Sequence, residues 1–145
     1  MEPVNYWQDL LDKGNQSFNN KQMLQAEFYY KEAVDYLDQR WSEDLVNIEF
    51  LMAWIYAAHN LSTLFEVQGD NDVSLQYLLL PHQRLLSIVS NDAFDNDIQL
   101  IAMRALKITF TPILEFTKKH PVCKNCQRAI KAFEIALAEQ QPQLH

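Results

Sequence analysis

The sequence predicts an all-α fold, and three observations lead to it. The chain has 145 residues but only two glycines and five prolines, which leaves little material for turns. Few runs of β-branched residues are available for strands. Apolar residues recur at helical spacing through most of the chain. We therefore expect about six antiparallel helices arranged as three helical hairpins.

The first hairpin is predicted from residues 3–39. Pro3 suits the first turn of a helix, and apolar residues from Val4 onward carry that helix to about Asn19. The polar segment "NNKQ" makes a turn, and a second amphipathic helix, whose apolar positions include Phe28, runs from Met23 to about Gln39.

The third helix is predicted over about 43–68, with Ser42 as its N-cap and Trp41 placed to pack against Val46. Its middle is apolar on every side, which is typical of a central helix. Gly69 is expected to end it in a left-handed conformation.

The fourth helix is predicted over about 71–90. The segment "SNDAFDND" caps the fifth helix, which runs to about Lys119, and the sixth is predicted over about 122–139. Pro81 lies inside the fourth helix, where a kink or a break is expected, and Pro112 lies inside the fifth, where a kink is expected. We expect a single domain over residues 1–141, followed by a frayed tail at 142–145.

Charge and composition limit the function classes. The net charge is −7, with 5 Lys+Arg and 16 Asp+Glu in residues 1–103 but 7 and 3 in residues 104–145. An acidic surface opposes nucleic-acid binding and favours a basic partner. No basic, apolar leader opens the sequence, and the longest apolar run has nine residues, against roughly 20 for a membrane helix. We expect a cytoplasmic protein without cofactor or membrane association.

One pattern of small and aromatic residues occurs twice with identical spacing. Ala26, Tyr30 and Ala33 fall on one stripe of the second helix, and the sixth helix repeats the spacing with Ala129, Phe133 and Ala136. Small residues beside a ring allow a neighbouring helix to approach closely. Gly14, which costs about 1 kcal/mol inside a helix relative to alanine, is expected where two helices cross.

With "KGNQSF" at residues 13–18, this pattern resembles the tetratricopeptide repeat family, whose signature is a helical hairpin with small, aromatic and small residues at that spacing. A degenerate middle copy is formed by Leu61, Phe65, Gly69, Ser74 and Leu78, and Pro81 stands where the final alanine belongs. The copies are 48 and 55 residues apart, whereas the family repeats about every 34. The resemblance implies a right-handed superhelix with long, irregular repeats; the alternative is a generic six-helix bundle.

The resemblance also implies a groove lined by the first helix of each hairpin. In one subclass two asparagines and several basic residues bind a partner's C-terminal carboxylate there. Asn15 and Asn60 match the asparagines, Arg104 and Lys107 are available, and Leu11 stands where the first lysine belongs. Solvated or capping roles for the asparagines are the alternative. Alternatively, Trp7, Phe18, Tyr29 and Trp54 could provide an apolar groove for a partner helix or extended segment, and some of these four must belong to the core.

The segment "HPVCKNC" places His120, Cys123 and Cys126 close together, and these could supply three of the four ligands of a zinc site. Cys123 also falls near a helix start beside Lys124, which suits a reactive thiol. Structural or incidental thiols are the interpretation we favour, because a single CxxC pair is a weak signal.

We therefore expect a non-enzymatic protein-interaction module that binds a peptide or protein segment in a helical groove, with a chaperone-like role implied by the resemblance. No catalytic motif is present in the sequence. The alternatives are a thiol or metal protein centred on His120, Cys123 and Cys126, and a structural homodimer that pairs exposed aromatic residues such as Trp41.

Overall fold

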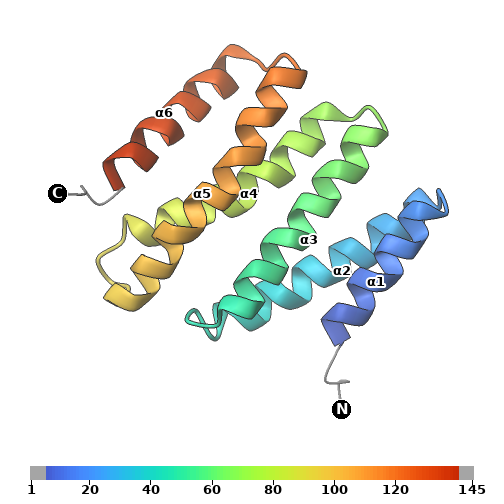
Figure 1. The fold of residues 1–145 in the computed structure, drawn as a ribbon, viewed down its shortest axis with the longest axis horizontal. Coiled ribbons are helices and arrows are strands. Elements are labelled where there is room, and N and C mark those ends of the chain that lie inside the picture. Colours follow the sequence, from blue (N-terminus) through green and yellow to red (C-terminus); the bar gives the residue numbers. More distant parts are fainter. Residues whose placement is uncertain (1–5, 141–145) are drawn as a thin grey trace. The chain divides into compact units, whose positions relative to one another are not determined.

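A computed structural model describes residues 6–140 of the chain (Figure 1). These residues form helices and turns, with no strand among them, so the all-α prediction of six helices is confirmed. The helices are α1 (Tyr6–Asn19), α2 (Met23–Ser42), α3 (Ile48–Val67), α4 (Asn71–Val89), α5 (Asn96–Lys119) and α6 (Lys124–Gln140). The predicted helix start at Pro3 and Val4 and the predicted tail at residues 142–145 lie outside the described part.

The chain divides into two compact units, Met1–Tyr77 and Leu78–His145, and the boundary falls inside α4. Unit 1 contains α1, α2, α3 and the first part of α4, and unit 2 contains the rest. The single domain over residues 1–141 and the right-handed superhelix stay predictions.

The α1–α2 hairpin is built around a close helix crossing at Gly14. A Cβ atom at this position would lie 2.5 Å from Cε1 and 2.7 Å from Cδ1 of Tyr30. The ring of Tyr30 therefore occupies the space that the absent side chain leaves. Ala26 and Ala33, on either side of Tyr30 in sequence, are fully buried. Gly14 thus lies where α1 and α2 pack, and both alanines belong to the core.

The junction between α2 and α3 corrects two predictions. Ser42 is not the N-cap of α3; it is the last residue of α2, and its hydroxyl donates to the Asp38 carbonyl. The cap is Asn47, whose side chain accepts from the Phe50 N–H at 3.0 Å. Trp41 is not an exposed aromatic residue, because it is only 1% exposed and stacks on Trp54 with ring centroids 5.3 Å apart.

The expected apolar face of α2 also differs from the one observed. Phe28 is 58% exposed and Leu24 is 83% exposed, so neither belongs to the core. The helix turns its small residues and Tyr30 inward, which leaves Phe28 on the outer side against the edge of Tyr29.

In unit 1, α3 meets the beginning of α4 through two buried serines. The hydroxyls of Ser62 and Ser74 lie 2.9 Å apart, and Ser74 also donates to the Ser62 carbonyl at 2.8 Å. Gly69 precedes this contact with φ +81°, the left-handed conformation predicted for it. Phe65 stacks on Tyr77 beside the serines, with ring centroids 5.7 Å apart.

The core of unit 2 contains a buried histidine. The His82 ring stacks on Phe110 of α5 and meets the edge of Phe133 of α6, with ring centroids 5.2 and 5.1 Å apart. Its Nδ1 lies 2.7 Å from the hydroxyl of Thr109, which donates to the Leu106 carbonyl. Because that hydroxyl has a single hydrogen, Nδ1–H donates to it and Nε2 remains unprotonated. Burial lowers the pKa of His82 to about 4.

Both prolines predicted to disturb helices lie inside continuous ones, since α4 runs through Pro81 and α5 runs through Pro112. A break at Pro81 is therefore excluded, and the kinks at Pro81 and Pro112 stay predictions. On α6, Ala129 and Ala136 are half-buried, whereas the alanines of the first hairpin are completely buried.

The Gly14→Ala substitution is expected to destabilise unit 1. Overpacking a buried site costs about 3 kcal/mol at the upper end, and the better helix propensity of alanine recovers about 1 kcal/mol. We expect a net loss of about 2 kcal/mol in the free energy of unfolding. Urea unfolding followed by tryptophan fluorescence measures it, because all three tryptophans lie in residues 1–77.

The matched control is Gln16→Ala, an exposed position on the same helix that should change stability by less than about 0.5 kcal/mol. A Gly14→Ala variant as stable as the Gln16→Ala control would show that the Tyr30 ring is not confined.

The buried His82 is expected to make unit 2 less stable in mild acid. Its pKa is 6.5 in an unfolded chain and about 4 in the fold, so between these values the unfolded state binds more protons and stability falls as pH falls. From about pH 7 to about pH 5 the loss is about 2 kcal/mol. Urea unfolding of wild type and His82→Gln, followed by circular dichroism, isolates this difference. An equal pH dependence in both proteins would contradict it.

Candidate functional site

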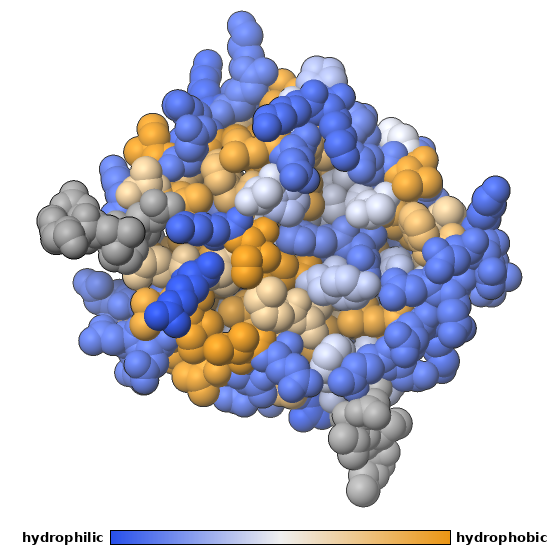
Figure 2. All heavy atoms as spheres, in the orientation of Figure 1, coloured by the Kyte–Doolittle hydropathy of each residue, from blue (hydrophilic) through white to orange (hydrophobic). Residues whose placement is uncertain are grey.

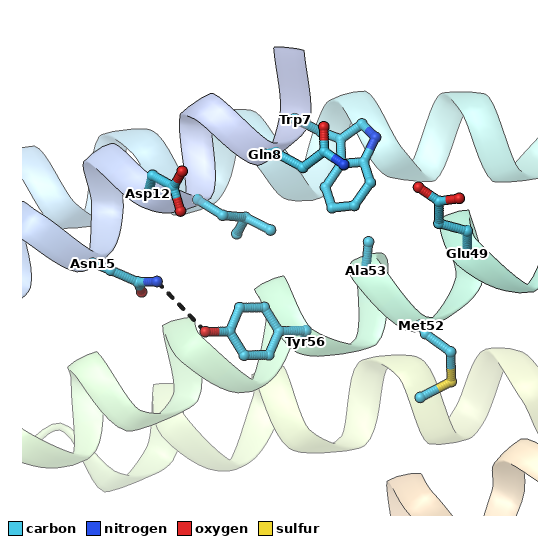
Figure 3. Close-up of a pocket in the computed structure, with 9 residues that line it drawn as sticks. Trp7, Gln8, Asp12, Asn15, Glu49, Met52, Ala53 and Tyr56 are labelled. Atoms are coloured by element: carbon cyan, nitrogen blue, oxygen red, sulfur yellow. Dashed lines mark hydrogen bonds between the residues drawn. The ribbon is translucent and has the colours of Figure 1, made fainter. Parts of the chain in front are cut away.

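A surface hollow of about 540 Å³ lies between α1 and α3 in unit 1. Figure 3 shows its walls: Trp7 and Asn15 on α1 face Ala53 and Tyr56 on α3. The lining comes from these two helices alone and consists of Trp7, Gln8, Leu11, Asp12, Asn15, Glu49, Met52, Ala53 and Tyr56. Its volume is within the range of sites that hold a small ligand or a few side chains.

The walls are largely apolar. Leu11 and Ala53 are buried, Trp7 and Met52 are half-buried, and the Tyr56 ring is 49% exposed. An aromatic side chain thus stands on each helix, and both expose part of a flat apolar surface. Such surfaces contribute to binding when they are covered by a partner.

The charged groups that line the hollow are hydrogen-bond acceptors. Asp12 and Glu49 are exposed carboxylates, and neither has an ion-pair partner among residues 6–140. The Gln8 Oε1 atom is buried without a hydrogen-bond partner in the same part of the chain. No Lys or Arg contributes to the lining. An occupant that brings donors or positive charge would therefore be favoured.

Unit 1, which contains the hollow, carries a net negative charge, as does the lining of the hollow. Residues 1–77 carry 4 Lys+Arg and 13 Asp+Glu, whereas residues 78–145 carry 8 and 6. Over the part of the face where α1 lies in Figure 1, hydrophilic side chains predominate in Figure 2. The field around the hollow therefore attracts cations.

Asn15 connects the hollow to the helix crossing. Its Oδ1 accepts from the Tyr30 hydroxyl at 2.6 Å, and its Nδ2 donates to the Tyr56 hydroxyl at 3.5 Å. Burial, together with the nearby Tyr56, raises the pKa of Tyr30 to about 12, so the Tyr30 hydroxyl keeps its proton and remains the donor. Asn15 is therefore neither a solvated nor a capping residue; it joins α1 to α2 and α3.

The structure brings together only part of the predicted groove. Leu11 and Asn15 line the hollow, whereas Phe18 and Asn60 do not, and the Nδ2 atom of Asn60 is buried without a partner among the described residues. The exposed Arg104 and Lys107 belong to α5 in unit 2. Of the four predicted groove aromatics, Trp7 lines the hollow. Trp54 lies in the core on Trp41, and Tyr29 contacts Phe28.

Most of the lining was not predicted from the sequence. Gln8, Asp12, Glu49, Met52 and Tyr56 were not expected as site residues. Their spacing carries a signal, because Gln8 and Asp12 are four residues apart, and Met52 and Tyr56 are as well, so each pair shares one helix face. Which faces meet depends on helix rotation, which the sequence does not specify.

The cysteine motif lies in unit 2, at the start of α6. The Sγ atoms of Cys123 and Cys126 are 3.0 Å apart, and the two residues are not joined by a disulfide. His120 instead packs against Phe116, with ring centroids 4.8 Å apart. Within residues 6–140 no group of three or more His, Cys, Asp and Glu side chains is arranged to hold a metal ion. The described geometry therefore offers two sulfur ligands and not the three that the sequence suggests.

None of the helices within residues 6–140 combines the length and the apolar character that crossing a membrane requires.

The model of the family described as "Protein of unknown function (DUF2753)" matches residues 5–145. Neither the curated proteins nor the solved structures contain a match to the chain.

The hydrogen bond between Tyr30 and Asn15 is expected to stabilise unit 1. Asn15→Ala leaves the buried Tyr30 hydroxyl without its partner, which should cost about 1–3 kcal/mol of unfolding free energy. Tryptophan-monitored unfolding of Asn15→Ala, Tyr30→Phe and the double variant gives the coupling between the two side chains. We expect a coupling of about 1 kcal/mol. Strictly additive effects of the two substitutions would contradict the interaction.

Proposed function

We propose that this chain, which belongs to the DUF2753 family, is a non-enzymatic protein-interaction module whose hollow between α1 and α3 binds an extended segment of another protein. The observation that carries the proposal is the composition of the hollow. Partly exposed aromatic walls alternate with acceptors that have no partner among the described residues. Binding to such a surface is favourable when a partner covers the rings and supplies hydrogen-bond donors.

We further propose that the architecture is tetratricopeptide-like. The support comes from the first hairpin, where the Tyr30 ring fills the space opposite Gly14 between two buried alanines. The hollow is lined by α1 and α3, the first helices of two consecutive predicted hairpins, and this is where the resemblance expects a binding surface. The long spacing between copies makes this an irregular version of that architecture.

The occupant we propose is a segment with a lysine or arginine flanked by apolar residues. The carboxylates of Asp12 and Glu49 would face the cationic group and accept its N–H groups. The aliphatic stem of the same side chain would lie along Trp7 and Tyr56, whose ring faces also attract a cation. The carboxylates of the hollow would then contact the charged end of one partner residue, and the aromatic rings would contact its stem.

A carboxylate ligand, which the resemblance suggested, is not part of the proposal. The Nδ2 group of Asn15, which would have to donate to a carboxylate, already donates to the Tyr56 hydroxyl, and no basic side chain lines the hollow. Two carboxylates in the lining would repel a C-terminal carboxylate. Holding a basic segment of another protein is a chaperone-like role, and we propose it in that form.

The binding of capped leucine-lysine-leucine peptides to the full chain tests the proposal. Nuclear magnetic resonance titration should show shifts at the residues lining the hollow and none at α5 or α6. Peptides with norleucine or glutamate in place of lysine are matched probes, and we expect about tenfold weaker binding of the norleucine peptide and weaker binding still of the glutamate one. Added salt should reduce the affinity of the lysine peptide more than that of the norleucine peptide.

The matched protein variants are Asp12→Asn/Glu49→Gln in the hollow and Glu32→Gln/Asp35→Asn on the exposed side of α2. Both pairs remove two negative charges, but only the first should reduce affinity, by about tenfold. Equal losses in the two variants would mean that net charge alone attracts the peptide. Tighter binding of the glutamate peptide would overturn the proposed occupant.

A further inference from the structure

Two thiols outside the hollow are arranged for chemistry of their own. Cys123 immediately precedes α6 and Cys126 lies in its first turn, with their Sγ atoms 3.0 Å apart. They are the only cysteines of the chain. The Cys123 side chain is exposed and that of Cys126 is half-buried, so an external reagent reaches the first sulfur more readily.

The surrounding backbone holds this pair in place. The Cys126 N–H donates to the Cys123 Sγ atom at 3.3 Å, so the sulfur caps one of the free N–H groups at the start of α6. The Gln127 side chain donates to the Val122 carbonyl at 3.0 Å, which ties the preceding segment to the helix. The thiols are therefore presented together at a fixed helix end rather than on two independent loops.

The two cysteines also have different electrostatic surroundings from the rest of the chain. Residues 118–131 carry five Lys or Arg and no Asp or Glu, whereas the chain as a whole is acidic. Positive charge, the helix dipole and a donated N–H all favour a negative charge on Cys123 Sγ. The same basic segment attracts an anionic reagent.

We propose that Cys123 and Cys126 form a reversible dithiol–disulfide pair that exchanges with small anionic disulfides, with Cys123 as the attacking thiol. The Cys123 thiolate attacks one sulfur of the external disulfide, which releases one thiolate and leaves a mixed disulfide on Cys123. The Cys126 thiolate then attacks Cys123 Sγ, closes the intramolecular disulfide and releases the second external thiolate. The two cysteines lose two electrons, the external disulfide gains them, and the two released thiolates take up the two cysteine protons.

This proposal is independent of the hollow, since it concerns unit 2 alone. It also replaces the zinc interpretation of the motif, because His120 packs on Phe116 and the described residues provide no three-ligand cluster. The chemistry uses the two sulfur atoms that the structure places in contact.

The full chain, equilibrated with mixtures of reduced and oxidised glutathione, tests the pair. Free thiols are then blocked with iodoacetamide and the protein is weighed by mass spectrometry. We expect one two-electron transition from the dithiol to an intramolecular disulfide, with no disulfide-linked dimer. Absence of the intramolecular disulfide at every ratio, or oxidation only between molecules, would overturn the proposal.

Single variants test the order of attack. Cys126→Ser should stop at the mixed disulfide with glutathione on Cys123. Cys123→Ser should react at Cys126 about tenfold more slowly. Circular dichroism checks that both variants keep their helices, and the double variant Cys123→Ser/Cys126→Ser gives the background. Equal rates in the two single variants would remove Cys123 as the attacking thiol.

Discussion

The contact between Gly14 and the Tyr30 ring determines the geometry of unit 1. Because the glycine has no side chain, the ring lies against the backbone of α1, and the two helices approach closely. This position places the Tyr30 hydroxyl next to Asn15, one residue after the glycine, and Asn15 in turn reaches Tyr56 on α3. The hairpin crossing and the wall of the hollow thus belong to one connected set of contacts.

The fold class followed from the sequence because local signals agree along most of the chain. Gly69, scarce glycine elsewhere and regular apolar spacing predicted six helices, and the structure has six in the described residues. The errors occur where several signals compete. Residues 42–47 contain Ser42, Asp44 and Asn47, each a good N-cap, and the sequence alone favoured the first while the fold uses the last.

The site was harder to predict, because it depends on which helix faces meet. Leu11 and Asn15 were found through a family pattern, but Asp12 and Glu49 resemble ordinary solvated charges in sequence. Trp41 was expected to be exposed but is buried on Trp54, and Phe28 was expected on the apolar face of its helix but is exposed. Small differences in helix rotation move a large ring between core and surface, and apolar periodicity does not specify rotation that closely.

The dual use of Asn15 has a consequence for how binding preference could diverge among relatives. Its amide both supports the helix crossing and forms part of the hollow, so a change there would alter fold and recognition at once. Asp12 and Glu49 also line the hollow, but they are exposed and form no ion pair among the described residues, so their substitution should cost little stability. New binding preferences would therefore arise by substitution of Asp12 and Glu49, while the contact between Tyr30 and Asn15 stays unchanged.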